Sequence, residues 1–321
     1  GRVVTDALRG RRVNAAEAGA RYHVRRMRSP RELDRLMADE RTFAAYAVAQ
    51  LEPMLFEESQ FWMAEGPTGR ALLMHSDAGM GRAIVTMGDP TALDALLSLH
   101  PGPASNYLAT GAPEHLPVIE RHFAVSGAVE MRRMAVDGFV FRHVAGTVRR
   151  LAGSDVGALN ALYSTEGGPT GYSAAHIQRG VYFGAYDGRW LVAVAGTHVV
   201  SPEAGIAVVG NVFTHPAYRG GGLATQVTSA VTEELLTRHG CRSVVLTVNP
   251  MNTPAVQAYT HLGFAYDRDV VEARLQRRDL LGVGALLRRW TARRAASGGL
   301  PGDEVTTGRP IPPVRSGGDN P

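Results

Sequence analysis

One segment constrains the fold more than any other: an apolar strand that runs into a glycine-dense turn and then into a long helical pattern. The strand covers 206–214, three consecutive glycines occupy 220–222, and apolar residues recur at helical spacing from Leu223 to Leu235. The first amides of a helix lack partners within it and lie at the positive end of its dipole. Glycine lets a phosphate approach such backbone closely. The segment predicts a diphosphate-binding turn, although the glycines alone also fit a plain turn before an amphipathic helix.

Two common phosphate-binding loops do not fit this segment. A Walker loop needs a lysine after its last glycine, and all 34 Lys-plus-Arg residues of the chain are arginines. A dinucleotide-binding fingerprint needs a third glycine, and an acidic residue at the end of the next strand. Here Thr225 stands at the third glycine position and the next strand ends in Asn249. A phosphate site at this turn is therefore of a different kind.

The pattern resembles the GNAT N-acetyltransferase superfamily in two blocks. Residues 219–224 match its acyl-CoA signature, Arg/Gln-x-x-Gly-x-Gly/Ala, and the Thr-His-Pro-Ala-Tyr lead-in at 214–218 is typical of it. Residues 252–264 contain the Asn, Ala and Tyr-x-x-Leu-Gly-Phe pattern that closes the other side of the cofactor cleft in the family. Two blocks in this order are far more specific than either alone. The resemblance extends over residues 144–275.

The resemblance implies that acetyl-CoA is the cofactor and that an amine accepts the acyl group. It implies that the amides at 220–225 hold the diphosphate, that the backbone at 212–214 pairs with the pantetheine arm like an added strand, and that Asn252 positions this arm. It also implies that Tyr259 protonates the departing thiolate, a nearly balanced transfer between a tyrosine of pKa about 10 and a thiol of about 8.5. The residues implied to contact the cofactor are Val212, Phe213, Thr214, Arg219, Gly220, Gly221, Gly222, Leu223, Ala224, Thr225, Asn252 and Tyr259.

The general base is not carried over from the family. Many members have a glutamate on the strand before the loop. This strand offers Asn211, which can orient a water but cannot itself take the proton of the amine. The remaining candidates are Glu166, His198, Glu203 and His215, of which Glu166 in the loop at 164–173 is the best carboxylate. His215 precedes a proline and is expected to cap or pack. The predicted catalytic residues are therefore Tyr259, Asn211 and Glu166.

The order of expected elements predicts an α/β (α+β) fold made of tandem GNAT-like domains, each a mixed, mostly antiparallel sheet flanked by helices. We expect a flexible lead-in at 1–22, a degenerate GNAT-like domain at 23–138, a catalytic GNAT domain at 139–278 and a largely disordered tail at 279–321. The expected helices cover 29–51, 89–97, 113–122, 154–163, 222–238 and 252–262. The expected strands cover 60–64, 70–75, 83–87, 105–110, 128–136, 144–151, 181–186, 190–200, 206–214, 243–248 and 264–276.

The first half lacks a phosphate-binding turn of its own. After the strand at 83–87 the chain reads Gly88-Asp89-Pro90-Thr91, and the carboxylate of Asp89 would repel a phosphate. We therefore interpret this half as a degenerate copy that shapes the substrate cleft or the interface between the domains.

Composition limits the partners. The formal charge of +4 comes from arginines spread along the chain, so nucleic acid is not an expected partner, and no run of 18 apolar residues predicts a membrane span. The single Cys241 excludes an internal disulfide and a cysteine zinc cluster, and no metal-ligand spacing occurs. With no secretory signal at 1–19, these features predict a cytoplasmic protein, and arginine without lysine is typical of a GC-rich bacterial genome.

Three functions remain open at this point. The first is direct acetyl transfer to a small-molecule or peptide amine, and the second a catalytically silent acyl-CoA sensor or interaction module. The third is surface attachment through the arginine-rich stretch at 280–294. The acceptor is not predicted: an acidic cleft would favour polyamines or aminoglycosides, and an apolar one arylalkylamines. Neither the acyl chain length nor the oligomeric state is predicted.

Overall fold

The structure, a computed structural model, describes residues 22–77, 82–278, 285–289 and 305–306. The strands in these ranges form one 13-stranded sheet in the order β13-β1-β2-β3-β4-β5-β12-β6-β11-β10-β9-β8-β7. They are β1 (His23–Met27), β2 (Ser59–Gly66), β3 (Gly69–Ser76), β4 (Ala83–Gly88), β5 (Asn106–Gly111), β6 (Phe123–Asp137), β7 (Val148–Arg150), β8 (Phe183–Asp187), β9 (Trp190–Ser201), β10 (Ile206–Thr214), β11 (Ser243–Val248), β12 (Ala265–Arg277) and β13 (Val305–Thr306). The helices are α1 (Pro30–Leu36), α2 (Ala45–Ala49), α3 (Pro53–Glu57), α4 (Pro90–Leu99), α5 (Leu116–His122), α6 (Val156–Ser164), α7 (Ala174–Arg179), α8 (Leu223–Thr237) and α9 (Thr253–His261), with short 3-10 turns η1 (Ala38–Glu40), η2 (Pro113–His115), η3 (Gly153–Asp155) and η4 (Pro216–Tyr218).

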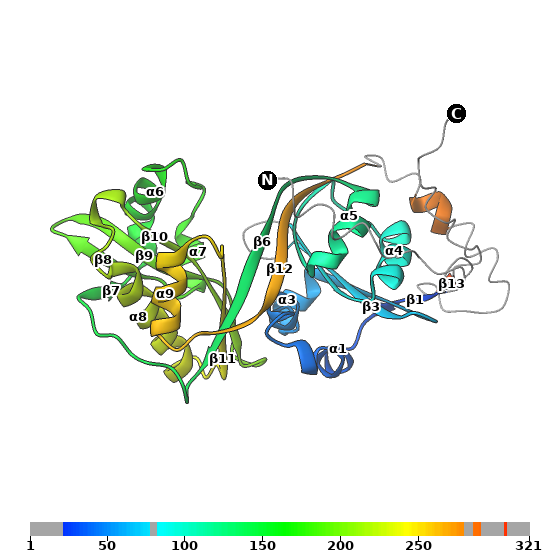
Figure 1. Cartoon of the computed structure of the whole chain (residues 1–321), viewed down its shortest axis with the longest axis horizontal. Helices are drawn as coiled ribbons and strands as arrows, with labels where there is room; N and C mark the ends of the chain where they lie inside the picture. The colour runs from blue at the N-terminus through cyan, green and yellow to red at the C-terminus, as the bar shows by residue number, and fades with distance from the viewer. Residues whose placement is uncertain (1–21, 78–81, 279–284, 290–304, 307–321) are drawn as a thin grey trace.

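Each half of the sheet has the same order of strands (Figure 1). In the first half β1 to β4 are antiparallel neighbours, and β4 then pairs in parallel with β5. In the second half β7 to β10 are antiparallel neighbours, and β10 pairs in parallel with β11. This confirms the predicted fold class, tandem α/β domains in which each sheet is mixed and mostly antiparallel.

The two halves exchange their last strands. β6 follows β5 in the chain but pairs with β11, and β12 follows β11 but pairs with β5. The exchanged strands also pair with each other, from Ala265 opposite Ala135 to Arg277 opposite Phe123, and run side by side between the halves (Figure 1). Each half is therefore completed by a strand of the other. The division at 138/139 stays a prediction, and it falls in the connection between β6 and β7.

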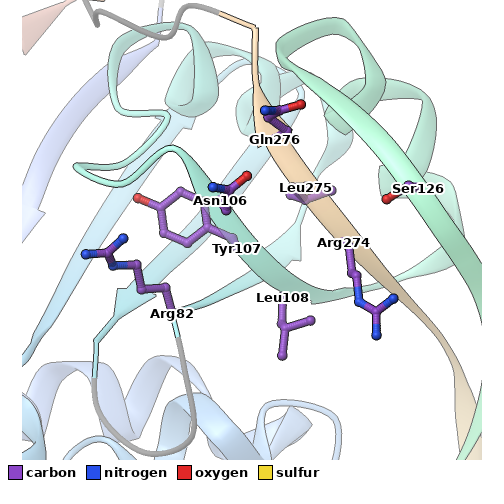
Figure 2. A pocket seen from close by; sticks show the side chains of 8 residues that line it. All are labelled: Arg82, Asn106, Tyr107, Leu108, Ser126, Arg274, Leu275 and Gln276. Atoms are coloured by element: carbon purple, nitrogen blue, oxygen red, sulfur yellow. The ribbon is translucent and has the colours of Figure 1, made fainter. Parts of the chain in front are cut away.

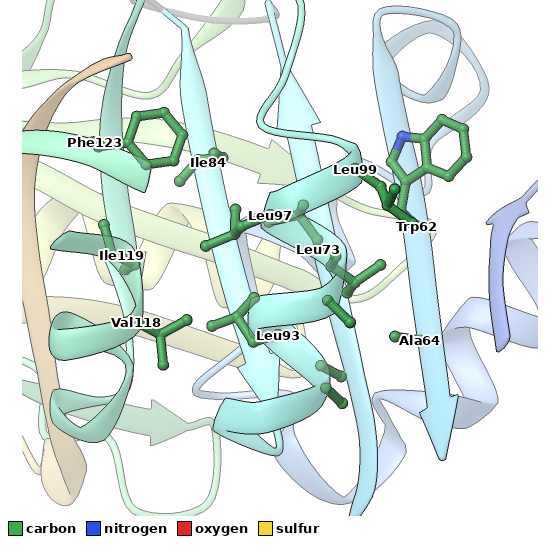
Figure 3. Packing of buried hydrophobic residues seen from close by; sticks show 14 of the residues in the cluster. Trp62, Ala64, Leu73, Ile84, Leu93, Leu97, Leu99, Val118, Ile119 and Phe123 are labelled. Carbon is green, nitrogen blue, oxygen red and sulfur yellow. The ribbon is translucent and has the colours of Figure 1, made fainter. Parts of the chain in front are cut away.

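The core of the first half lies between α4 and the strands beneath it (Figure 3). Leu93 and Leu97 point from one side of α4 towards Leu73 of β3 and Ile84 of β4, and all four are at most 1% exposed. Helical spacing puts the two leucines on one face of α4, and each buried side chain of this size contributes about 1.5–3 kcal/mol. This packing fixes β4 and β5, which support the exchanged strand β12.

The segment α1–α3 belongs to the first half but covers strands of the second. Phe43 and Val48 of this segment share a buried cluster with Val208 of β10 and Val245 of β11. Polar contacts hold the same interface: an Arg41 Nη atom donates to the Ala204 carbonyl at 2.6 Å, and the Ser201 hydroxyl donates to Glu52 at 3.0 Å. The first half therefore forms part of the surroundings of β10, the strand that carries the predicted site.

The second half buries its sheet on both faces. Val227, Val231 and Leu235 form the buried stripe of α8 and share a cluster with residues of α9. Helices α6 and α7 pack on a separate cluster that contains Leu159 and Ile177. Strand β10 thus lies between two helical layers.

Several local predictions were wrong. The single helix expected at 29–51 is divided into α1, η1 and α2, because the polar stretch at 38–42 offers no apolar face to continue the helix. The expected strand at 144–151 is reduced to β7. The helix expected at 154–163 begins only at Val156, because residues 153–155 form η3, where Asp155 accepts from the Ala152 amide at 2.8 Å. Strand β1 and the six-residue helix α7 were missed because short elements carry little periodic signal.

Two findings concern the predictions about membranes. Within the described ranges, no helix is long and apolar enough to cross a bilayer. Of the arginine-rich stretch at 280–294, residues 285–289 are described and helical, whereas the rest lies outside the described residues. Arg288 donates to the Ser98 carbonyl at 2.7 Å, and Arg289 to that of Leu99 at 2.8 Å. This short helix therefore contacts the end of α4 in the first half.

Candidate active site

Strands β10 and β11 diverge in the middle of the second half. Their parallel pairing begins at Ile206 opposite Ser243 and ends at Val209 opposite Leu246, although both strands continue beyond this point. Beyond this pair of residues, the edge of 210–214 that faces β11 has no backbone partner in the part of the chain that the structure describes. Unpaired strand backbone of this kind can bind an extended ligand as an additional strand.

A bulge at Asn211 accompanies this divergence. The register of β10 against β9 shifts between Gly210 and Phe213, and Asn211 has a φ of 56°, the one left-handed value for a residue other than glycine in the described ranges. The Asn211 carbonyl accepts a hydrogen bond from the Tyr163 hydroxyl, and its side-chain amide donates to the Tyr182 hydroxyl at 3.4 Å. Burial raises the pKa of Tyr163 well above its usual range, so this hydroxyl keeps its proton and remains a donor. The two tyrosines hold the bulge from the α6 side.

The amides at the start of α8 are bare. Gly220 and Gly222 have φ values of 85° and 75°, and no side chain caps the helix. Among the described residues, the amides of 220–225 find no hydrogen-bond acceptor, and the helical bonding begins where the Gln226 amide donates to the Gly222 carbonyl at 3.1 Å. A Cβ atom built on Gly220 or Gly222 would meet nothing within 4 Å, so the space beside these amides is open. The turn therefore has the donors and the room that an anion requires.

Side chains on both flanks hold this turn in place. Arg219 donates from Nε to the Thr214 carbonyl at 3.1 Å and forms an ion pair with Glu166. The Tyr218 hydroxyl donates to Asp187 at 2.6 Å, which ties the turn to the hairpin between β8 and β9. Glu166 thus lies on the flank of the glycine turn at 220–222, and it would have to leave Arg219 before it could accept a proton.

Tyr259 lies in the core between the diverging strand and α8. It is 7% exposed, and it shares a cluster with Val212 of β10 and Leu223 at the start of α8. Its hydroxyl makes no hydrogen bond within the described part of the chain, and burial raises its pKa to about 12. The expected balance with a thiol of pKa about 8.5 therefore shifts against proton transfer, although a thiolate buried in the same place would be destabilised for the same reason.

Asn252 caps the helix that carries Tyr259. Its side-chain oxygen accepts from the Ala255 amide at 3.3 Å, so its remaining amide donors are available to a ligand. The cap fixes the start of α9, which positions Tyr259 two turns later.

The other candidate bases occupy different places. His215 caps η4 by accepting from the Ala217 amide at 3.2 Å, as expected. Glu203 precedes β10, whereas Asn211 lies five residues into that strand, a separation of about 16 Å or more. His198 packs over Gly210, whose Cβ would fall 1.9 Å from the histidine Nε2. His198 is an exposed residue, yet the protein groups crowded around its ring and the charge of Arg133 lower its pKa to about 4.

Tyr163, Tyr182, Tyr46 and Arg133 contribute to these surroundings but were not predicted. No motif or spacing in the sequence singles out these residues. Two cavities lie away from these residues. One is lined by residues of β5, β6 and β12 such as Tyr107 and Leu275 (Figure 2), and the other lies beside α9.

In the first half, side chains of the protein occupy the place that corresponds to the free amides at the start of α8. Asp89 accepts from the amides of Thr91 at 3.1 Å and Ala92 at 2.8 Å, which occupies the start of α4. The parallel pairing of β4 with β5 ends at Val85, and His115 lies just beyond, bonded to the Thr86 hydroxyl and the Gly88 carbonyl, both at 2.9 Å. The first half is thus a copy of the fold without the site.

Comparisons with known proteins agree with this geometry. The family model described as the acetyltransferase (GNAT) family matches residues 156–264, a range that contains the diverging strands, the bare turn and Tyr259. A solved GCN5-related N-acetyltransferase from Kribbella flavida is 18% identical over 73% of this chain and 95% of its own, with a TM-score of 0.52. A solved protein from Drosophila is 13% identical over 79% of this chain and 98% of its own, with a TM-score of 0.56. None of the curated proteins matches the chain.

Residues 156–264 are therefore a domain of the GNAT acetyltransferase family. The likeness to the two solved structures extends the fold across both halves of the chain. The first half is a degenerate copy of the same fold.

Proposed function

We propose that the protein transfers an acetyl group from acetyl-CoA directly to an amine. The observation that carries this proposal is the pair of features at the end of β10: unpaired strand backbone at 210–214, followed by bare amides at 220–225. The first suits an extended amide-containing arm and the second a diphosphate, and coenzyme A joins these two groups.

The residues present fit this cofactor. The space beside Gly220 and Gly222 is open, and the hydroxyl of Thr214 is buried without a hydrogen-bond partner among the described residues. Buried polar atoms are normally paired, so an unpaired hydroxyl at the end of the diverging strand β10 is consistent with a ligand there. The thioester of acetyl-CoA, when bound, supplies an acyl group activated for attack by an amine.

Tyr259 and Asn211 act on this chemistry from two sides. The Tyr259 hydroxyl stays protonated at neutral pH and is a donor for the sulfur that leaves. The bulge at Asn211 directs backbone towards the reacting carbonyl, and its side chain orients a water that takes the amine proton. Glu166 remains our proposed carboxylate for the final proton, which requires it to leave Arg219.

Direct transfer is favoured over a covalent enzyme intermediate. Cys241 is 4% exposed, and burial raises the pKa of its thiol to about 11. At neutral pH it is therefore a protonated, inaccessible thiol and a poor nucleophile.

Isothermal titration with acetyl-CoA tests the proposal, with Gly221→Asp as the matched variant. Gly221 has no positive φ, and a Cβ there would come no closer than 3.7 Å to another atom, so the fold tolerates a side chain. The new carboxylate would occupy the amides as Asp89 does in the first half, and we expect acetyl-CoA to bind about 10- to 100-fold more weakly. Gly221→Asn has the same size without the charge and should lose less.

Two outcomes would change this conclusion. If the wild-type chain does not bind acetyl-CoA at millimolar concentration, the proposal fails. If it binds acetyl-CoA but releases no thiol with any of a broad panel of amines, the chain is an acyl-CoA-binding module instead.

A further inference from the structure

A cation without a partner lies beside the proposed reaction centre. Arg133 of β6 is 0% exposed, and its Nε, Nη1 and Nη2 atoms are all buried without a hydrogen-bond partner in the described ranges. No described carboxylate forms an ion pair with it: Asp267 pairs with Arg268 at 3.3 Å, and Glu272 remains beyond ion-pair distance. An arginine cannot release its proton, so this interior keeps a full positive charge.

Such a group is costly for the folded chain. Buried charges are stable when they are paired and hydrogen-bonded, and a buried guanidinium with three free nitrogen atoms is an exception that requires a cause. Among the described residues, the guanidinium packs against the Tyr46 ring, whose centroid lies 5.5 Å from the guanidinium carbon. A cation–π contact leaves the five N–H donors of the guanidinium without acceptors.

The register of the sheet places Arg133 next to the diverging strands. Arg133 of β6 lies directly opposite Thr247 of β11, and directly opposite residues direct their side chains to the same face. The Thr247 hydroxyl is the next unpaired buried atom in this row. Because Val209 lies opposite Leu246, Thr247 neighbours Gly210, the residue covered by His198. Unpaired donors thus lie on the α2 side of the sheet, where β10 and β11 part.

The surrounding groups compensate the positive charge of Arg133 only from a distance. Tyr46 from α2 and His198 from β9 face the guanidinium, and their rings lie 6.1 Å apart. The protein groups crowded around His198 and the charge of Arg133 lower the pKa of this histidine to about 4, and burial raises the pKa of Tyr46, so neither side chain carries a charge at neutral pH. The nearest acids, Glu272 and Asp267, act on Arg133 only from a distance. The unpaired donors of Arg133 and Thr247 therefore attract an anion.

We propose that Arg133 and Thr247 bind a carboxylate carried by the acceptor, so that the acceptor is a short amino acid. This inference rests on the proposed function. A guanidinium offers a planar fork that matches a carboxylate, and a threonine hydroxyl adds a further donor. The backbones at Arg133 and Gly210 are two strand spacings apart, about 10 Å, and the long arginine side chain covers much of that distance.

The carboxylate reaches this site past His198. His198 is an exposed residue, whereas the guanidinium of Arg133 is fully buried and lies beneath the Tyr46 ring. Entry requires the Tyr46 side chain to move aside, so that the carboxylate replaces the cation–π contact with direct hydrogen bonds. Tyr46 lies in α2 of the first half, and Arg133 lies in β6, the strand that the first half contributes to the second. Residues of the first half would thus select the acceptor that reacts in the second half.

A matched panel of acceptors tests this proposal. Each L-amino acid is compared with its carboxamide, which keeps the amine but lacks the negative charge, and thiol release from acetyl-CoA is measured. We expect kcat/KM for the acid to exceed that for the amide by about 10-fold or more, and Arg133→Met to lower this ratio to about 1. Arg133→Lys should keep part of the ratio, because the charge remains but the fork is lost.

The adjacent arginine supplies the control. Arg132 points to the opposite face of β6, where its guanidinium lies 5.9 Å from the Tyr266 ring, so Arg132→Met should leave the ratio unchanged. A thermal melt of the free protein separates a ligand site from a structural role. Replacing an unpaired buried charge by a methionine should leave Tm unchanged or raise it, whereas loss of a structural contact would lower it.

The outcomes are separable from those of the proposed function. Acetyl-CoA titration of the wild-type chain tests the transferase site and does not involve Arg133. If amides and acids are acetylated equally well, if only neutral amines are acetylated, or if Arg133→Met lowers both rates equally together with Tm, the carboxylate site is excluded. A collapsed acid-to-amide ratio at unchanged or raised Tm supports it.

Discussion

Helices α4 and α8 both follow a strand that pairs in parallel with its neighbour, yet they begin in opposite ways. At α4, Asp89 bonds the first free amides and also accepts from the Thr68 hydroxyl at 2.5 Å. At α8, Gly222 provides no side chain and the amides stay free. A capping carboxylate is worth about 0.5–2 kcal/mol to a helix, so α8 gives up stability that α4 retains.

The diverging strands show the same contrast. His115 is 1% exposed and fills the space beyond the parallel pair of the first half with two hydrogen bonds. In the second half the corresponding edge is unpaired, and Thr247 has a buried hydroxyl without a partner among the described residues. Binding sites are commonly less stable than their surroundings, because the groups that bind a ligand are unsatisfied without it. The contrast therefore supports the proposal that the second half is the one that binds the cofactor.

The largest effect that would sharpen this comparison concerns two buried tyrosines, one in each half. Tyr259→Phe removes the proposed proton donor, and we expect kcat to fall by about 100-fold or more with little change in KM. Tyr107→Phe removes a hydroxyl that accepts from the Ala104 amide at 2.6 Å in the first half and should lower stability without a comparable loss of kcat. Steady-state kinetics of both variants measure the difference. Equal losses of kcat would show that Tyr259 has no special role in the reaction.

The next effect is a dependence of stability on pH, and it comes from histidines whose pKa is lowered in the folded protein. Burial lowers the pKa of His75 to about 4, whereas the unfolded chain binds the proton near its usual pKa of about 6.5. Between these values the unfolded state holds more protons, so stability falls as pH drops from about 6.5 to about 4, by about 3 kcal/mol for His75. His115 and His198, whose pKa values are also lowered, act in the same direction.

Urea denaturation across this pH range measures the slope. His75→Gln keeps a donor for the His100 carbonyl, which His75 contacts at 3.0 Å, and removes the titrating group. Its stability should depend less on pH than that of the wild type. An unchanged slope would mean that His75 does not titrate between its folded and unfolded values.

The sequence predicted the second half better than the contacts between halves, for a physical reason. The glycine turn at 220–222, strand β10 and the helix α9 that carries Tyr259 are each contiguous in sequence, so rules of local sequence describe them. The exchange of β6 and β12 is not local, because the order of elements is the same whether each strand pairs within its half or with the other. Arg133 and Tyr46 meet only through that exchange. His115 belongs to no motif that the sequence reveals.

The smallest expected effect tests whether the capping carboxylate of Asp89 alone explains why the first half lacks an acetyl-CoA site. Asp89→Ala removes the bonds to the Thr91 and Ala92 amides and should lower the free energy of unfolding by about 0.5–2 kcal/mol. It should not create a second acetyl-CoA site, because His115 still fills the space between β4 and β5, so titration should give the stoichiometry of the wild type. Asp77→Ala, which removes an exposed ion pair with Arg82, serves as the control and should change stability by less than about 1 kcal/mol. A second binding event in Asp89→Ala would mean that the capping carboxylate alone keeps the first half inactive, and that the filled strand gap is secondary.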